Sequence, residues 1–210
     1  MDPNSVKGIG FDATCSLAVL DRETDEPIAV TAPSFDNADG LDRNVILWLD
    51  HRAGEETEAI NATQHPLLKY VGGTMNIEME MPKVLWLKKH MPPELFGRCK
   101  FYDLVDALTH LATGRETRSY CSAVCKQGYV PVGVDGTVKG WQEDFYHAIG
   151  LGELVEDDFK RVGGVDGVVS LFFPSLLFLP EASLRLARGT RSDSCRRTEP
   201  FSAPASWSAR

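Results

Sequence analysis

Short apolar runs alternate with longer helical patterns along the chain, and this order is typical of an α/β protein. The apolar runs at residues 6–11, 17–20 and 44–49 predict buried strands, and residues 28–30 are expected to extend the same sheet. Residues 32–42 are rich in Asp, Asn, Gly and Pro and predict a loop. The first part of the chain is therefore expected to supply the sheet.

Helical spacing dominates the middle of the chain, where helices are predicted at residues 54–63, 82–89, 102–112 and 141–149. In the second helix, Val84, Leu85 and Leu87 form the apolar side, and Lys83 is expected on the outside. The third helix has its own set of apolar positions at helical spacing, which are Leu104, Val105, Leu108, Leu111 and Ala112.

The pattern changes after Gly167. Residues 168–180 carry no charge and have neither helical nor strand period, and residues 168–210 hold six Arg but no Lys. The net charge is +3 over residues 168–210 and −11 over residues 1–167. We therefore predict one domain at residues 1–167 and an unrelated, disordered low-complexity tail at residues 168–210, for which intron read-through is one origin and a natural mobile tail is the alternative.

Composition narrows the possible functions. The 210 residues carry a net charge of −8, which disfavours a nucleic-acid partner, and the five cysteines are too few for a disulfide scaffold. Apolar runs stay shorter than a membrane span, and the first residues do not resemble a secretory signal. We therefore expect a soluble, cytoplasmic protein that does not bind membranes.

The first group of candidate site residues follows the first predicted strand. Asp12, Thr14, Cys15 and Ser16 are small and polar, and ligands of open α/β sheets gather at such strand ends. The alternative is a tight turn held by local hydrogen bonds of Asp12 and Thr14.

A second group follows the strand predicted at residues 44–49. Trp48, Asp50 and His51 combine an apolar face with polar groups, which suits a polyhydroxylated ligand. The alternative is a surface ion pair between Asp50 and Arg52. A nucleophilic arrangement of Cys15, His51 and Asp50 is also conceivable and would make the protein a hydrolase.

A third group comprises Cys121, Cys125 and Lys126. The two cysteines could bind zinc with the help of Cys99 or a His, but without a second close Cys/His pair they are better interpreted as ordinary thiols. Lys126 stands among small and apolar residues, where it could meet an anionic or hydroxyl-bearing ligand or extend to the surface.

Together these groups resemble the amino-terminal domain of FGGY carbohydrate kinases, most closely the ribulokinase-like pentulose kinases. The strings that carry the resemblance are GIGFDATCS at residues 8–16, WLDHRA at 48–53, YVGG at 70–73, PKVLWL at 82–87 and CSAVCK at 121–126. The resemblance covers residues 6–167. It implies an actin-like, ribonuclease-H-like α/β domain that holds a sugar, with a second such domain beyond it.

The resemblance also implies a site and a reaction. The residues expected to line the sugar side are Asp12, Thr14, Cys15, Ser16, Trp48, Asp50, His51, Glu78 and Lys126. Such kinases transfer the γ-phosphoryl group of ATP to a sugar hydroxyl with Mg²⁺, and a full-length member could be a homo-oligomer.

The sequence departs from this family in two places. The family's glycine-rich phosphate hairpin lies upstream of the first matched strand, and its general base, an Asp, lies in the second domain with most of the ATP site. We therefore expect a partial domain without its first strands, with no catalytic residue and no metal site of its own, and inactive alone. The alternative is a non-enzymatic sugar-binding or regulatory fragment that pairs with a full-length kinase.

Overall fold

A computed structural model of the chain describes residues 5–6, 8–36, 43–131, 139–165 and 167–169. Nearly all of them belong to one compact unit, Gly8–Leu177. Only Ser5 and Val6 belong to a second unit, which comprises Met1–Lys7 and Phe178–Arg210. The tail at residues 168–210 is predicted to be disordered. Its residues from 170 onward lie outside the described residues, so this disorder stays a prediction.

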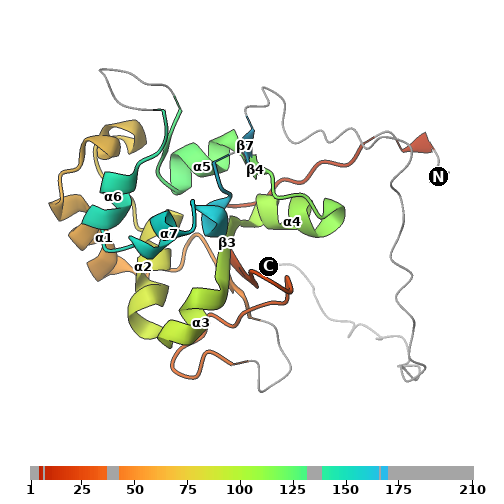
Figure 1. The fold of residues 1–210 in the computed structure, drawn as a ribbon, viewed down its shortest axis with the longest axis horizontal. Helices are drawn as coiled ribbons and strands as arrows, with labels where there is room; N and C mark the ends of the chain where they lie inside the picture. The colour runs from red at the N-terminus through yellow and green to blue at the C-terminus, as the bar shows by residue number, and fades with distance from the viewer. Residues whose placement is uncertain (1–4, 7, 37–42, 132–138, 166, 170–210) are drawn as a thin grey trace, which may run out of the picture. The chain divides into compact units, whose positions relative to one another are not determined.

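A three-stranded antiparallel sheet forms the centre of the larger unit (Figure 1). Strand β1 (Leu17–Asp21) lies between β2 (Val45–Ile46) and β3 (Cys99–Asp103). Leu17 lies opposite Ile46 of β2 and opposite Asp103 of β3. Because both pairings are antiparallel, the beginning of β1 lies beside the ends of its two neighbours.

The remaining elements surround this sheet. The longer helices are α1 (Gly54–Ala62), α2 (Glu80–His90) and α4 (Leu104–Thr113), and the shorter ones are η2 (Pro66–Val71), α3 (Pro93–Arg98), α5 (Tyr120–Lys126), α6 (Glu143–Ala148), α7 (Glu153–Glu156) and η3 (Lys160–Val162). Strand β4 (Arg118–Ser119) pairs in parallel with β7 (Val168–Val169), and β5 (Tyr129–Val130) pairs antiparallel with β6 (Gly140–Trp141).

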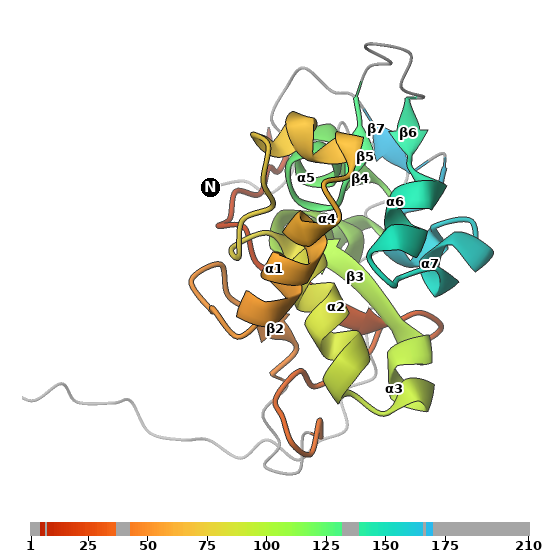
Figure 2. The ribbon, with the colours of Figure 1, turned by 90° about the vertical axis from the view of Figure 1, so that its left-hand side faces the viewer.

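The central sheet is buried on both faces. Leu17 and Val19 alternate with Ala18 and Leu20 along β1, and the two pairs belong to different apolar clusters. The larger cluster includes Val84 and Leu87 of α2, whereas Ala107 of α4 belongs to the smaller one. Figures 1 and 2 accordingly show α2 and α4 on opposite sides of β3. The α/β class and the central strand are confirmed.

The helices predicted at residues 54–63, 82–89 and 141–149 are confirmed as α1, α2 and α6, with small differences at their ends. The strand predicted at residues 6–11 is wrong, because residues 8–11 form no continuous strand and Ile9 is 53% exposed. An apolar run describes one segment only, whereas a strand also requires a hydrogen-bonding neighbour.

The strand predicted at residues 44–49 is much shorter than expected. Beyond Ile46 the chain turns, the Asp50 N–H donates to the Leu47 carbonyl at 3.1 Å, and Leu47, Trp48 and Leu49 are exposed. Residues 28–30 are buried as expected but form no strand.

The helix predicted at residues 102–112 begins later and buries another face. Cys99–Asp103 form β3, which the sequence reasoning missed, and α4 starts at Leu104. Its buried side chains include Asp106 and His110, whereas Leu111 is 60% exposed. This face can be buried because Asp106 accepts the Ser119 N–H at 2.9 Å and a ring nitrogen of His110 lies 3.1 Å from the Arg115 carbonyl.

Candidate functional site

Two segments that carry candidate residues meet the end of β3 at one end of the central sheet. Ser16 directly precedes β1, and its carbonyl accepts the N–H of Leu104, the residue after β3, at 2.8 Å. Its hydroxyl accepts the Trp48 N–H, just beyond β2, at 3.2 Å. The antiparallel register is the reason for this meeting, because it aligns the start of β1 with the ends of β2 and β3.

Lys83 of α2 joins the Trp48 loop to the segment that precedes α2. Its ammonium donates to the carbonyl oxygens of Leu47 at 2.7 Å, Trp48 at 3.3 Å and Glu78 at 3.2 Å. The expectation that Lys83 lies outside is wrong, because its side chain is fully buried. Burial lowers the pKa of Lys83, and three carbonyl acceptors compensate for the water that the ammonium loses.

Cys15 lies against the segment that precedes α2, where its thiol contacts the Glu78 carbonyl at 3.5 Å. Burial, with the nearby Glu80 carboxyl, raises the pKa of Cys15 to about 12. Glu80 itself is fully buried, and burial together with the nearby Asp103 raises its pKa well above the usual range. Among the described residues, its carboxyl receives a hydrogen bond only from the Gln127 amide, at 2.6 Å. The Cys15 thiol is thus held protonated, which disfavours the nucleophilic arrangement.

We predict that an alkylating reagent such as iodoacetamide at pH 7.5 modifies the exposed Cys121 long before Cys15. A pKa of about 12 leaves Cys15 with about a thousandfold less thiolate than an ordinary thiol, and the thiolate is the reacting species. Peptide mass spectrometry over a time course measures both sites, with the buried Cys99 as the slow reference. Preferential modification of Cys15 would restore the hydrolase hypothesis.

Lys126, the last residue of α5, reaches the same end of the sheet. Its ammonium donates to the carboxylate of Asp103, the last residue of β3. The Lys126 side chain is 17% exposed, so it neither extends fully to the surface nor is sealed off. Sequence reasoning named Lys126 without its partner.

The other candidate residues are placed differently. Asp12 and Thr14 are exposed in the segment before β1, with the Thr14 hydroxyl 3.3 Å from that of Ser16. The Asp50 carboxylate accepts Nε and Nη2 of Arg52 at 2.9 and 2.6 Å, so the ion pair weighed as an alternative is present. Hydrogen bonds from Arg52 lower the pKa of Asp50. His51 is exposed in the loop.

A possible metal cluster lies away from this site. Ligand atoms of Asp25, His110 and Glu116 all lie within 4.8 Å of one another, and no other such group occurs in the described part of the chain. The ammonium of Lys100, however, lies 3.2 Å from Asp25 and 2.7 Å from Glu116. Burial alone would lower the pKa of Lys100, but hydrogen bonding with Glu116 and Tyr102 raises it. A permanent cation thus occupies the place of a metal ion.

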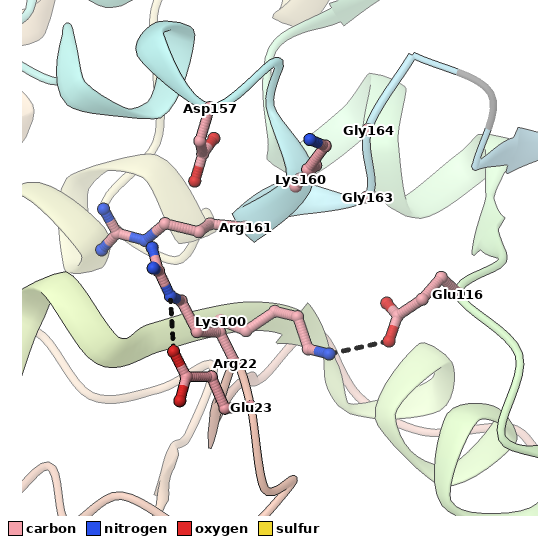
Figure 3. A pocket seen from close by; sticks show the side chains of 9 residues that line it. All are labelled: Arg22, Glu23, Lys100, Glu116, Asp157, Lys160, Arg161, Gly163 and Gly164. Carbon is pink, nitrogen blue, oxygen red and sulfur yellow. Dashed lines mark hydrogen bonds and ion pairs between the residues drawn. The ribbon is translucent and has the colours of Figure 1, made fainter.

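The pocket in Figure 3 lies toward the opposite end of β1. Its volume is about 580 Å³, and its lining includes Arg22, Lys100 and Lys160 beside Glu23, Glu116 and Asp157. Lys100 donates to Glu116, and Arg161 donates from Nε to the Cys99 carbonyl at 2.7 Å. With Arg161 its lining holds four basic and three acidic residues, and none of the residues predicted for the sugar side lines it.

Three residues of the candidate site were missed from the sequence. Lys83 was read as a surface residue, and Asp103 and Ser122, although they lie in a predicted helix and in the CSAVCK string, were not named as site residues. Asp103 did carry a local signal, because an acidic residue directly before a helical pattern commonly marks a helix start. The burial of Lys83 between two loops has no comparable local signal.

Comparison with known proteins supports the interpretation of the motifs. Over 164 residues the chain is 56% identical to "D-ribulokinase YDR109C" from Saccharomyces cerevisiae and 44% identical to the "FGGY carbohydrate kinase domain-containing protein" from Homo sapiens. These matches cover 78% of this chain but only 22% and 28% of the two relatives. The resemblance to FGGY carbohydrate kinases is therefore confirmed, and the chain spans about a quarter of the length of these relatives. No protein-family model matches the sequence.

The fold has a counterpart among solved structures. A crystal structure described as a xyloylose kinase from Brucella ovis matches with a TM-score of 0.54 and 19% identity, over 80% of this chain and 29% of that one. This likeness confirms the fold class. Among the described residues, the helices are all too short or too polar to cross a membrane.

Proposed function

We propose that the chain forms the sugar-binding part of an FGGY-type carbohydrate kinase, which transfers the γ-phosphoryl group of ATP to a hydroxyl of a pentulose. The similarity to D-ribulokinase over 164 residues supports this family and this class of sugar. We propose that residues 1–167 are the part of the chain that belongs to the kinase, because charge and composition change after residue 167. Strand β7 lies just beyond this boundary.

One observation carries the proposal: Ser16, Trp48 and Lys126 all lie at one end of the sheet. The contact between Cys15 and Glu78 lies at the same end. Sugars are bound by hydrogen-bonding groups beside an apolar surface that covers their C–H faces. Lys126 provides the first kind of group and the partly exposed Trp48 provides the second, while the fully buried Ser16 holds the Trp48 loop in place through its hydroxyl. Asp12, Thr14, Asp50 and His51 are proposed as the outer part of this wall.

ATP and Mg²⁺ are proposed for the whole kinase, not for the described residues. The acidic group formed by Asp25, His110 and Glu116 does not fit Mg²⁺, because Lys100 holds its centre and because Mg²⁺ prefers oxygen ligands. We therefore derive no phosphoryl-transfer step from this chain. Residues 1–210 alone are proposed to bind sugar without turnover.

Titration calorimetry of the 210-residue chain with ribulose and xylulose tests this proposal. We expect saturable binding that the Lys126→Met variant weakens about tenfold, as expected for the loss of a charged hydrogen-bond donor. Lys160→Met, which removes an exposed cation from the pocket in Figure 3, is the matched control and should bind like the wild type. Absence of binding by the wild-type chain would refute the sugar-binding role.

An ADP-release assay with ribulose and ATP separates the kinase from a regulatory fragment. We expect no turnover by the chain alone, because the proposed ATP site and general base belong to the kinase beyond residues 1–167. Sugar-dependent ADP release at ordinary kinase rates would contradict this expectation. Binding without turnover, together with co-purification of a longer kinase, would favour the regulatory alternative.

A further inference from the structure

The carboxylate of Asp103 is buried at the centre of the candidate site. Asp103 ends β3, and its side chain is fully inaccessible to solvent. One oxygen, Oδ2, accepts both the Ser122 hydroxyl at 2.7 Å and the Lys126 ammonium. The other oxygen, Oδ1, is also buried and has no hydrogen-bond partner among the described residues. Lys126 therefore supplies the countercharge that this buried carboxylate requires.

The same pair determines where the Lys126 ammonium lies. A lysine side chain has four rotatable carbons and is strongly hydrated, so in the absence of a partner it turns toward water. Here one of its three donors is committed to Asp103, while 17% of the side chain remains exposed. The remaining donors are thereby kept near Cys15 instead of being free to move with the solvent.

The charge of Lys126 is maintained by its surroundings. The titratable groups that act on it are Asp103 of β3, Cys15 of the segment before β1, Glu80 of α2 and, within α5, Cys125. Burial alone would lower the pKa of Lys126, but the hydrogen bond and charge of Asp103 raise it above the ordinary value. Asp103 thus favours the protonated form of the ammonium.

We propose that Asp103 is a positioning residue for the sugar site, which holds the Lys126 ammonium in place while making no contact with the sugar itself. Ser122 supports it by filling a second acceptor position on the same oxygen. This inference rests on the proposed function, because it assigns to Asp103 a role in sugar affinity that is exerted entirely through Lys126.

A double-mutant cycle on the 210-residue chain tests this role. We expect Asp103→Asn to weaken pentulose binding about tenfold at pH 7.5, and more at alkaline pH, where the unpaired Lys126 loses its proton. In the Lys126→Met background, Asp103→Asn should change the affinity for the pentulose less than twofold, because the ammonium through which Asp103 acts is absent. Ser122→Ala removes a neutral partner of the same oxygen and should leave the pH profile of binding unchanged.

Independent outcomes separate this inference from the proposed function. Equal losses on Asp103→Asn with and without Lys126 would overturn the positioning role, even if the chain binds pentuloses normally. If Asp103→Asn does not fold, nitrogen NMR of the wild-type lysine ammonium groups decides. A measured pKa below 10 for the Lys126 ammonium would overturn the inference. A measured pKa above that of an ordinary lysine would support it. Failure of the wild-type chain to bind any pentulose would refute the proposed function, while the NMR titration would still report on the ion pair.

Discussion

The Lys83→Met variant is expected to unfold with a free energy about 2 to 3 kcal/mol lower than that of the wild type. Methionine fits the space of the buried stem but removes the donor that the carbonyls of Leu47, Trp48 and Glu78 share. These acceptors lose the partner that they share beside the fully buried Lys83 side chain, and unpaired polar groups next to a buried site are costly. Urea denaturation followed by circular dichroism measures the difference.

A matched control and a local readout make this prediction specific. Lys69→Met changes a lysine in η2 whose ammonium lies 5.1 Å from the Tyr70 ring centroid, and it should alter the unfolding free energy by less than about 0.5 kcal/mol. Hydrogen exchange should accelerate most at residues 47–50 and 78, the segments that Lys83 joins. A Lys83→Met chain as stable as the Lys69→Met chain would show that water can replace the ammonium.

The difference in unfolding free energy between Asp106→Asn and the wild type is expected to shift by about 2 kcal/mol in favour of the variant between pH 4 and pH 7. Burial raises the pKa of Asp106 from 3.8 to about 6, so the folded state binds its proton more tightly than the unfolded state does. This contribution to stability is complete below about pH 4 and is lost as the pH rises through about 6. Asparagine does not titrate and can still accept the Ser119 N–H through its side-chain oxygen.

Urea denaturation at half-unit steps from pH 4 to pH 7.5 measures this shift. Comparing the variant with the wild type at each pH largely cancels the other titrating groups, including carboxylates such as Asp21 whose pKa is lowered in the folded state. Asp158→Asn, at an exposed carboxylate elsewhere, is the control and should give a flat difference. If the difference in unfolding free energy between Asp106→Asn and the wild type also did not change with pH, the Asp106 carboxyl of the wild type would not be desolvated in the folded state.

Local sequence patterns predict the structure correctly where one segment contains the whole signal. The apolar run at residues 17–20 became the central strand, and α1, α2 and α6 formed where helical spacing predicted them. The motif strings identified the family because they combine residue type, order and spacing over most of the chain. All of these are local properties or sums of local properties.

Local sequence patterns mispredict a residue's burial and contacts where its partners lie in another segment. Lys83 looks like a surface lysine within α2, yet the carbonyls of the Trp48 loop make its burial favourable. The buried face of α4 holds Asp106 and His110, because β4 and the loop before it supply their partners. Asp103 looks like a helix start, whereas its carboxylate is committed to Lys126 and Ser122 of α5.

By itself, then, the sequence determined the fold class, the family resemblance and the set of polar residues from which the site is drawn. Tertiary structure alone decided which of them meet, because the antiparallel register of β1 with β2 and β3 brings Ser16, Trp48 and Asp103 to one end of the sheet. It also decided which charges are buried, since Lys83 and Asp103 lose water only when their partners replace it. Pairing between distant segments is a property of the folded chain, and no single stretch of sequence contains it.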